Sequence, residues 1–143
     1  MECNYSISFQ FGPNIFEIML KKVETPLAPA PIGPYSQAIC AGNLVWVSGC
    51  IALKPGADSI DTGSVEEEAL LVMENLKAIV EASGSSLAKI IKTTIFLTDM
   101  TAFPMVNKIY GGFLQMPYPA RETVQVSALP KGAQIEISCV ASL

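Results

Sequence analysis

The sequence predicts an α+β domain in which a single mixed β-sheet packs against two helices. Short runs of alternating apolar and polar residues, typical of strands, recur along the chain, and two longer segments have helical periodicity. The expected order is strands, helix, strand, helix, strands, with no internal repeat and no linker. At 143 residues the chain fits one domain that buries roughly 68–70% of its unfolded surface.

The N-terminal segment resembles no targeting sequence. Residues 1–18 contain two glutamates and no lysine or arginine, whereas a signal peptide starts with basic residues and a transit peptide is rich in arginine. We therefore expect an N-terminal extension over residues 1–18, whose order the sequence does not specify, and one domain over residues 19–143. A first strand is expected from Phe16 to Val23.

Proline dominates the next segment, "TPLAPAPIGPYSQA" at residues 25–38. Each proline fixes its own φ and restricts the residue before it, so this segment is expected to be extended or turned. The run "AICAGNLVWVSGC" then predicts two strands around a turn at Gly42 and Asn43.

A helix is expected from the capping box at Ser64 to Ala82, with Gly84 closing it. Ser64 is followed three residues later by Glu67, and acidic residues fill the first turn, where they interact favourably with the helix dipole. One stripe of the helix is apolar and is expected to face the core: Val65, Ala69, Val72, Met73, Leu76 and Val80.

The C-terminal half predicts a strand at residues 90–99, a helix at 101–116 that ends near Gly111 and Gly112, and two last strands at 122–129 and 133–141. A Pro130-Lys131-Gly132 turn is expected to join these two strands as a hairpin. Because a hairpin aligns the apolar faces of its strands, the hypothesis places Arg121 and Glu136 together on the polar face.

Composition excludes several classes of site. The chain has no histidine, which rules out Ser-His-Asp and Cys-His sites and metal sites with histidine ligands. The pI of about 4.7 and the scattered lysines argue against a nucleic-acid interface. The four cysteines show no metal-ligand spacing, so free thiols in a reducing compartment are expected.

Mean hydropathy is +0.41, which is high for a small protein, although no apolar run has the length of a membrane span. A large interface between subunits is the simplest cover for the apolar excess. We expect no membrane partner.

Arg121 is the only arginine, although the chain has eight lysines. If Val126 lies opposite Ile135 in the hairpin, Glu136 is four residues from Arg121 along the strand, or roughly 13 Å. The two side chains could then converge on a small ligand, with an anion clamp at one end and a carboxylate at the other. This hypothesis requires both groups to face the same crevice.

Each residue also has a plainer interpretation. Arg121 could form a surface ion pair with Glu122, and Glu136 could simply be solvated on a polar strand face. Tyr35 could be a packed turn tyrosine, and Ser48 with Gly49 could be a plain strand end. Phe103 could be a core aromatic, and Asn107 a helix-surface amide. Cys50 and Cys139 are expected to be small buried hydrophobes.

Five stretches, taken together in order, favour the functional interpretation over the plainer ones. They are "APAPIGPYSQA", "VSG", "VMENLKAIVEASGSSLAKIIKTTIFLTDM", "FPMVNKIY" and "PARETVQVSALPKGAQIEI". Together they resemble the RidA/YjgF family of reactive-intermediate deaminases, from about residue 22 to the C-terminus. The resemblance implies a chorismate-mutase-like fold, a homotrimer with its sheets lining the centre, and ligand clefts between subunits. It implies hydrolysis of 2-iminobutanoate and 2-iminopropanoate to keto acids and ammonia, without a cofactor or a metal.

Carried over by motif, the resemblance implies that Arg121 binds the substrate carboxylate and that Glu136 orients or activates water. Tyr35, Ser48, Phe103 and Asn107 would shape the pocket. The N–H of Gly49 and the C=O of Thr123 would complete its hydrogen bonds. The expected location is the cytoplasm, with an organelle of similar redox poise as the other option.

The sequence departs from the family pattern at Cys50, where many members have glutamine, and at Thr123, where cysteine is frequent. The loop before Pro119 is short, and the N-terminal extension is not covered by the resemblance. Two other functions stay open: a non-catalytic metabolite-binding or chaperone-like trimer, and an endoribonuclease or translation inhibitor, against which the acidic pI and the missing histidine argue.

Overall fold

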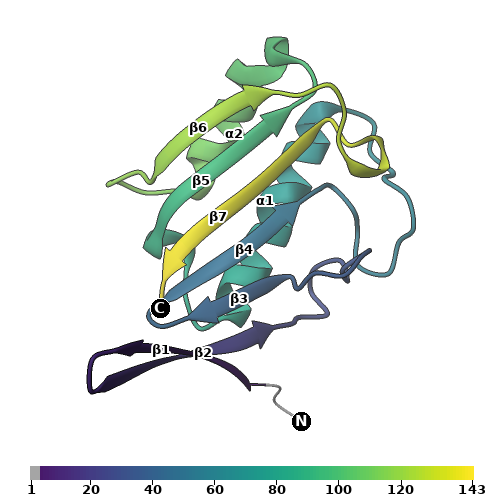
Figure 1. The fold of residues 1–143 in the computed structure, drawn as a ribbon. Helices are drawn as coiled ribbons and strands as arrows, with labels where there is room; N and C mark the ends of the chain where they lie inside the picture. The colour runs from purple at the N-terminus through teal and green to yellow at the C-terminus, as the bar shows by residue number, and fades with distance from the viewer. Residues whose placement is uncertain (1–3) are drawn as a thin grey trace.

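The computed structural model describes residues 4–143, and its strands form one seven-stranded sheet (Figure 1). The strand order is β1-β2-β3-β4-β7-β5-β6, and only β5 and β6 run parallel. The strands are β1 (Asn4–Phe11), β2 (Asn14–Val23), β3 (Ala38–Ala41), β4 (Leu44–Cys50), β5 (Ile90–Leu97), β6 (Ala120–Gln125) and β7 (Ile135–Ser142), and the helices are α1 (Val65–Ala82) and α2 (Phe103–Phe113). The predicted fold class, a mixed sheet with two helices, is confirmed.

Both helices lie on one face of the sheet, as Figure 1 shows, and we call this the helix side. The opposite face, which we call the open face, is not covered by any described element. Along β7 the residues alternate strictly between buried and half-buried, because odd-numbered side chains point to the helices and even-numbered ones to the open face. Trp46 on β4 lies on the open face and is 53% exposed.

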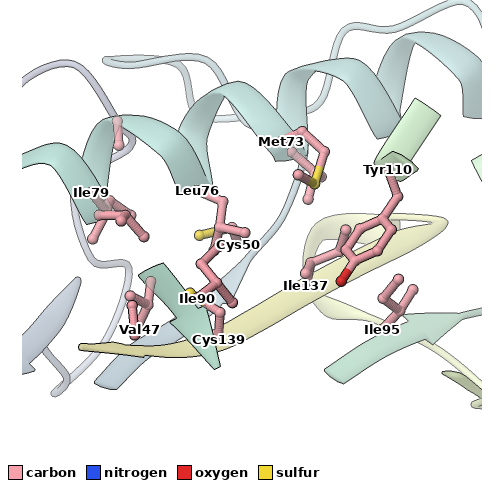
Figure 2. Packing of buried hydrophobic residues seen from close by; sticks show 14 of the residues in the cluster. Val47, Cys50, Met73, Leu76, Ile79, Ile90, Ile95, Tyr110, Ile137 and Cys139 are labelled. Atoms are coloured by element: carbon pink, nitrogen blue, oxygen red, sulfur yellow. The ribbon is translucent and has the colours of Figure 1, made fainter. Parts of the chain in front are cut away.

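The core fills the space between the sheet and α1. Figure 2 shows Met73, Leu76 and Ile79 of α1 pointing toward the strands, with the hydroxyl of Tyr110 from α2 reaching the sheet beside them. Five of the six stripe residues predicted for α1 are buried, and Val65 packs against their edge. Burial of this stripe stabilises α1 far more than its intrinsic helix propensity does.

The first strands differ from the sequence prediction. The expected strand at Phe16–Val23 begins earlier, at Asn14, and a further strand, β1, pairs with it around Gly12, whose φ is +61°. Tyr5, Ile7 and Phe9 of β1 lie on the open face and are exposed. This hairpin adds an apolar strip to the open face. Residues 1–3, including Cys3, lie outside the described part of the chain.

The predicted hairpin between the last two strands is wrong. β5 lies between β6 and β7, so β5, α2 and β6 form a parallel βαβ unit, and β6 ends at Gln125, four residues before the predicted end. The chain leaves β6 and crosses the end of β5, where Val126 donates to the Leu97 carbonyl and Thr98 donates to that of Gln134. The nine residues between the strands allow this crossing, which a tight turn would not.

The α1 N-terminus has the predicted capping box. Ser64 Oγ accepts a hydrogen bond from the Glu67 N–H at 3.2 Å, and the Glu67 carboxylate reaches back to the N–H of Gly63 at 2.6 Å. The predicted helix at 101–116 is shorter in the structure, because residues 100–102 form a 3₁₀ turn and the chain becomes extended at Leu114. Neither helix in the described residues has the length and hydropathy of a membrane span.

Replacing Ser64 by alanine removes the cap acceptor and is expected to lower the free energy of unfolding by about 1 kcal/mol. Urea unfolding at a fixed protomer concentration measures this difference. Ser59→Ala, an exposed loop serine without a side-chain hydrogen bond, is the control and is expected to leave stability unchanged. Equal stability of the Ser64→Ala and Ser59→Ala proteins would show that the cap does not contribute.

Candidate functional site

Arg121 lies at the start of β6, in register with the buried Thr93 of β5, and its side chain points to the helix side of the sheet. Its Nη1 donates to Asn107 Oδ1 at 2.7 Å. The guanidinium carbon lies 5.5 Å from the centroid of the Phe103 ring and 5.1 Å from that of Tyr110. These contacts hold the guanidinium in one orientation at the edge of the sheet.

All three partners of Arg121 come from α2 at positions that share one helix face, because residues three or four apart lie next to each other. Tyr110 is anchored by a 2.8 Å hydrogen bond between its hydroxyl and Thr93 Oγ1, which is buried. Burial raises the pKa of Tyr110, against the opposing effects of the Thr93 hydrogen bond and the Arg121 charge. Tyr110 was not predicted from the sequence, although its spacing from Phe103 and Asn107 on one helix was a usable signal.

The Arg121 pocket has about 400 Å³ of space and is also lined by Gly111, Tyr118 and Pro119. Among residues 4–143 no carboxylate forms an ion pair with Arg121, and its one recorded hydrogen bond goes to a neutral amide. Glu122, the partner offered by the plainer interpretation, instead bonds Lys92 and Thr94 on the open face. The remaining N–H groups of Arg121 can therefore bind a planar anion from outside.

Glu136 lies on the open face of β7 and lines a second pocket of about 240 Å³, together with Ile32, Tyr35, Ser48, Gly49, Ile51 and Pro130. Burial raises the pKa of the Glu136 carboxyl above its ordinary value of 4.5. No described cation offsets this effect, so the carboxyl is a better proton acceptor than a fully solvated glutamate.

A β-bulge in β4 positions Gly49 against Glu136. Val47 pairs with Cys139 and Cys50 pairs with Ile137, so Ser48 and Gly49 occupy the irregular segment between these pairs. A Cβ atom at position 49 would overlap the Glu136 carboxylate, with only 2.6 Å left to Cδ. Only glycine allows the carboxylate to lie directly against the backbone here.

The proline-rich loop completes the Glu136 pocket. Gln37 is 4% exposed and holds this loop, since its Oε1 accepts from the Thr25 N–H and its Nε2 donates to three carbonyls, those of Thr25, Ala28 and Pro29. Ser48 Oγ donates to the Ser36 carbonyl at 2.7 Å. The Tyr35 hydroxyl accepts from the Ile32 N–H at 3.2 Å, and its ring stays 46% exposed at the pocket.

The expectation that Arg121 and Glu136 share one polar face is wrong. In the register of the sheet Arg121 aligns with Thr93 and Cys139 on the helix side, whereas Glu136 aligns with Phe96 on the open face. Their positions differ by three residues along the strands, roughly 10 Å, and by two strands across the sheet, again roughly 10 Å. A single chain therefore carries two separate pockets, one around Arg121 and one around Glu136, and we call each of them a half-site.

The structure groups the other predicted residues by half-site. Asn107 and Phe103 contact Arg121, while Tyr35, Ser48 and Gly49 surround Glu136. Thr123 follows Arg121 on the helix side, and its hydroxyl is buried without a hydrogen-bond partner among the described residues. Cys50 and Cys139 are free, buried thiols as expected, and burial raises the pKa of Cys139 to about 12.

Comparison with known proteins identifies the family and the fold. The family model described as "Endoribonuclease L-PSP" matches residues 25–143. The 2-iminobutanoate/2-iminopropanoate deaminase of Dermatophagoides farinae is 44% identical over 118 residues, which cover 82% of this chain and 92% of that protein. The chain belongs to the RidA/YjgF family.

Other members of the RidA family agree in sequence and fold. The chloroplastic Reactive Intermediate Deaminase A of Arabidopsis thaliana is 47% identical over 121 residues, covering 85% of this chain and 65% of that protein. The crystal structure of E. coli TdcF with bound serine superposes with a TM-score of 0.81 at 42% identity, covering 86% of this chain and 98% of TdcF. The RidA family model begins at residue 25, so β1 and β2 lie before the matched region.

The buried carboxyl of Glu136 makes stability depend on pH. Its pKa is raised in the folded chain, so the folded state binds this proton more tightly, and the stabilisation is full below about pH 4.5 and lost as the pH rises through the folded pKa. Glu136→Gln, which does not ionise, is therefore expected to gain stability relative to the wild type as the pH rises.

Urea unfolding between about pH 4 and pH 8 at one protomer concentration checks this expectation. The matched control is Glu74→Gln, an exposed glutamate on α1. A stability difference between Glu136→Gln and wild type that stays constant or shrinks with rising pH would contradict the assignment.

Proposed function

We propose that the chain catalyses the hydrolysis of 2-imino acids, such as 2-iminobutanoate and 2-iminopropanoate, to 2-keto acids and ammonia. The observation that carries the proposal is the Arg121 guanidinium, which Asn107 and two rings orient and which pairs with no carboxylate in residues 4–143. The printed names of relatives such as the D. farinae and human deaminases, the latter 39% identical over 124 residues, support the same reaction.

Arg121 binds the carboxylate of the substrate in this proposal. A guanidinium matches a carboxylate with two parallel N–H···O bonds, whereas a lysine supplies a point charge. Each hydrogen bond to a charged group contributes about 1.5–3 kcal/mol. Asn107 accepts from one nitrogen only, so the guanidinium keeps donors for the substrate.

The site is completed by a second copy of the chain, because Arg121 and Glu136 of one chain lie on opposite faces of the sheet. We infer a homotrimer in which the Arg121 pocket of one copy meets the Glu136 pocket of the next. Its support is the open face, where Trp46, Ile91 and Val124 are each at least 42% exposed, together with the exposed apolar strip of β1. Apolar surface of this extent is typical of a subunit interface.

Glu136 is the proton acceptor. The carbon of the protonated imine is electrophilic, so water adds to it without a covalent enzyme intermediate, while Glu136 takes one proton from that water and a neutral carbinolamine forms. Glu136 returns this proton to the nitrogen, the C–N bond breaks and ammonia leaves. The carbinolamine hydroxyl loses its proton to solvent as the C=O bond of the keto acid forms. General base catalysis of this kind contributes roughly 10²–10⁴-fold.

The smaller groups orient the substrate and the water. The N–H of Gly49 and the C=O of Thr123 supply a donor and an acceptor, and the Tyr35 ring and the Phe103 ring wall the two half-sites. Ser48 acts mainly through the loop, because its hydroxyl is already bonded to the Ser36 carbonyl. The chemistry requires neither a cofactor nor a metal.

Arg121→Lys is expected to lower kcat/KM roughly ten- to hundred-fold, because it loses the paired bonds to the carboxylate. The measurement is a coupled assay in which a threonine dehydratase generates the imine and the rate of keto-acid release is compared with and without this protein. Circular dichroism and the oligomeric state are expected to stay unchanged. The control is Lys77→Arg, an exposed pair partner of Glu81 on α1.

In the same assay Glu136→Gln is expected to lower kcat while keeping KM, since carboxylate binding is retained.

Near wild-type kcat/KM in Arg121→Lys would refute the role of Arg121. No acceleration of keto-acid release by the wild type would refute the proposed function.

Metabolite binding without catalysis is the second candidate, and the serine bound in E. coli TdcF is the observation that favours it. A binding protein needs the Arg121 pocket but has no use for a carboxyl of raised pKa against Gly49. Binding of a keto acid without any acceleration of imine hydrolysis would favour this candidate.

A further inference from the structure

We propose that an apolar cavity behind Ser48 and Gly49 receives the side chain of the substrate, so that the chain prefers 2-imino acids with aliphatic side chains of about three or four carbon atoms. This inference rests on the proposed function and specifies its substrate class. The cavity measures about 40 Å³ and lies under the proline-rich loop. Since a single water needs roughly 10–15 Å³, the space accepts a short aliphatic chain.

The cavity adjoins the Glu136 pocket. Both spaces are lined by Ile32, Tyr35, Ser48, Gly49 and Ile51, so the two lie side by side at the β4 bulge. A substrate whose imine carbon is held against Glu136 has its side chain attached to that same carbon. The cavity is therefore the adjacent space that we assign to this side chain.

The far wall of the cavity is formed by α1 and the chain after β4, where Leu53 and Ile79 are buried. The two amide side chains in the wall already use their N–H donors. Asn75 Nδ2 donates to the carbonyls of Ile51 at 3.0 Å and Leu53 at 2.9 Å, and the Gln37 amide is bonded to the loop backbone.

No charged side chain lines the cavity. A guest therefore meets mainly aliphatic surface, because the amide donors of Gln37 and Asn75 are already used. A charged side chain buried there would have no opposite charge, and a polar one would find few partners, whereas an aliphatic side chain gains contacts and loses water. The geometry thus selects against the imines of polar amino acids such as glutamine.

The fixed loop keeps this space open. Gln37 ties the loop at Thr25, Ala28 and Pro29, and Ser48 ties it at Ser36 and Gln37. The cavity is consequently a feature of the folded loop, and a side chain of the substrate fills it without displacing a hydrogen bond.

The test compares imines generated in situ by an L-amino-acid oxidase from alanine, leucine and glutamine. We expect kcat/KM for the leucine-derived imine to exceed that for the alanine-derived imine at least about tenfold, and the glutamine-derived imine to gain nothing from its length. Ile79→Phe fills the far end of the cavity and is expected to abolish the preference for leucine, so that kcat/KM for the leucine-derived imine no longer exceeds that for the alanine-derived imine.

Ile79→Ala deepens the cavity and serves as the second variant if Ile79→Phe fails to fold, with a shift of preference toward the longer methionine-derived imine expected. The matched control is Val80→Ala, a buried neighbour on α1 that does not line the cavity and is expected to keep the wild-type preference. An unchanged preference in both Ile79 variants would overturn the inference.

A binding readout separates this inference from the proposed function. The keto acid derived from leucine is expected to shift the Ile79 methyl resonances of the wild type, whereas pyruvate is not. Hydrolysis of all imines at equal rates overturns the inference and leaves the proposed function intact. Absence of any imine hydrolysis overturns the proposed function, and unperturbed Ile79 methyl resonances overturn the cavity assignment independently.

Discussion

The contact of Arg121 with α2 is the interaction on which the candidate site depends. Asn107 holds one guanidinium nitrogen, the Phe103 and Tyr110 rings hold its plane, and Tyr110 is fixed in turn by the buried Thr93 of the adjacent strand. The guanidinium therefore has a fixed orientation before any ligand arrives, which reduces the entropy lost on binding. An ion pair with a neighbouring carboxylate would have removed the charge that a ligand needs.

The second constraint is the alternation of side chains across the sheet. It places the Glu136 carboxyl on the open face, where the β4 bulge and the glycine at position 49 let it lie against the backbone. Because Arg121 points to the other face, the proposed reaction requires the assembly of several chains. The high mean hydropathy and the exposed apolar residues of the open face are consistent with this link.

Much of the fold could be predicted from the sequence, because local signals agreed with tertiary packing. The capping box at Ser64, the apolar stripe of α1 and the turn at Gly42 each have a local physical cause, and all three are present in the structure. Most residues around the two pockets were also named in advance, through motif resemblance and not through geometry. They are Phe103 and Asn107 beside Arg121, and Tyr35, Ser48 and Gly49 beside Glu136; Tyr110 was not among them.

The pairing of the last strands could not be predicted, because two adjacent strands with a Pro-Lys-Gly segment between them have the local pattern of a hairpin. Insertion of β5 between β6 and β7 is decided by the packing of α2 on the sheet, which no local pattern shows. β1 was missed for a similar reason, since its alternation is weak evidence until β2 supplies a partner. The placement of Arg121 relative to Glu136 was also wrong because Val124 of β6 faces the open side, whereas Ile135 and Ile137 of β7 face the helices.

Mixed assembly of two variants tests the central claim most directly, namely that each site takes Arg121 from one chain and Glu136 from the next. Arg121→Ala and Glu136→Gln chains, each inactive alone, would be unfolded, mixed in equal amounts, refolded and assayed for imine hydrolysis, with differently tagged chains showing that mixed trimers form. In random trimers a cleft receives both intact residues with a probability of about one quarter, so about a quarter of the wild-type rate is predicted. Mixed trimers without any recovered activity would contradict the account.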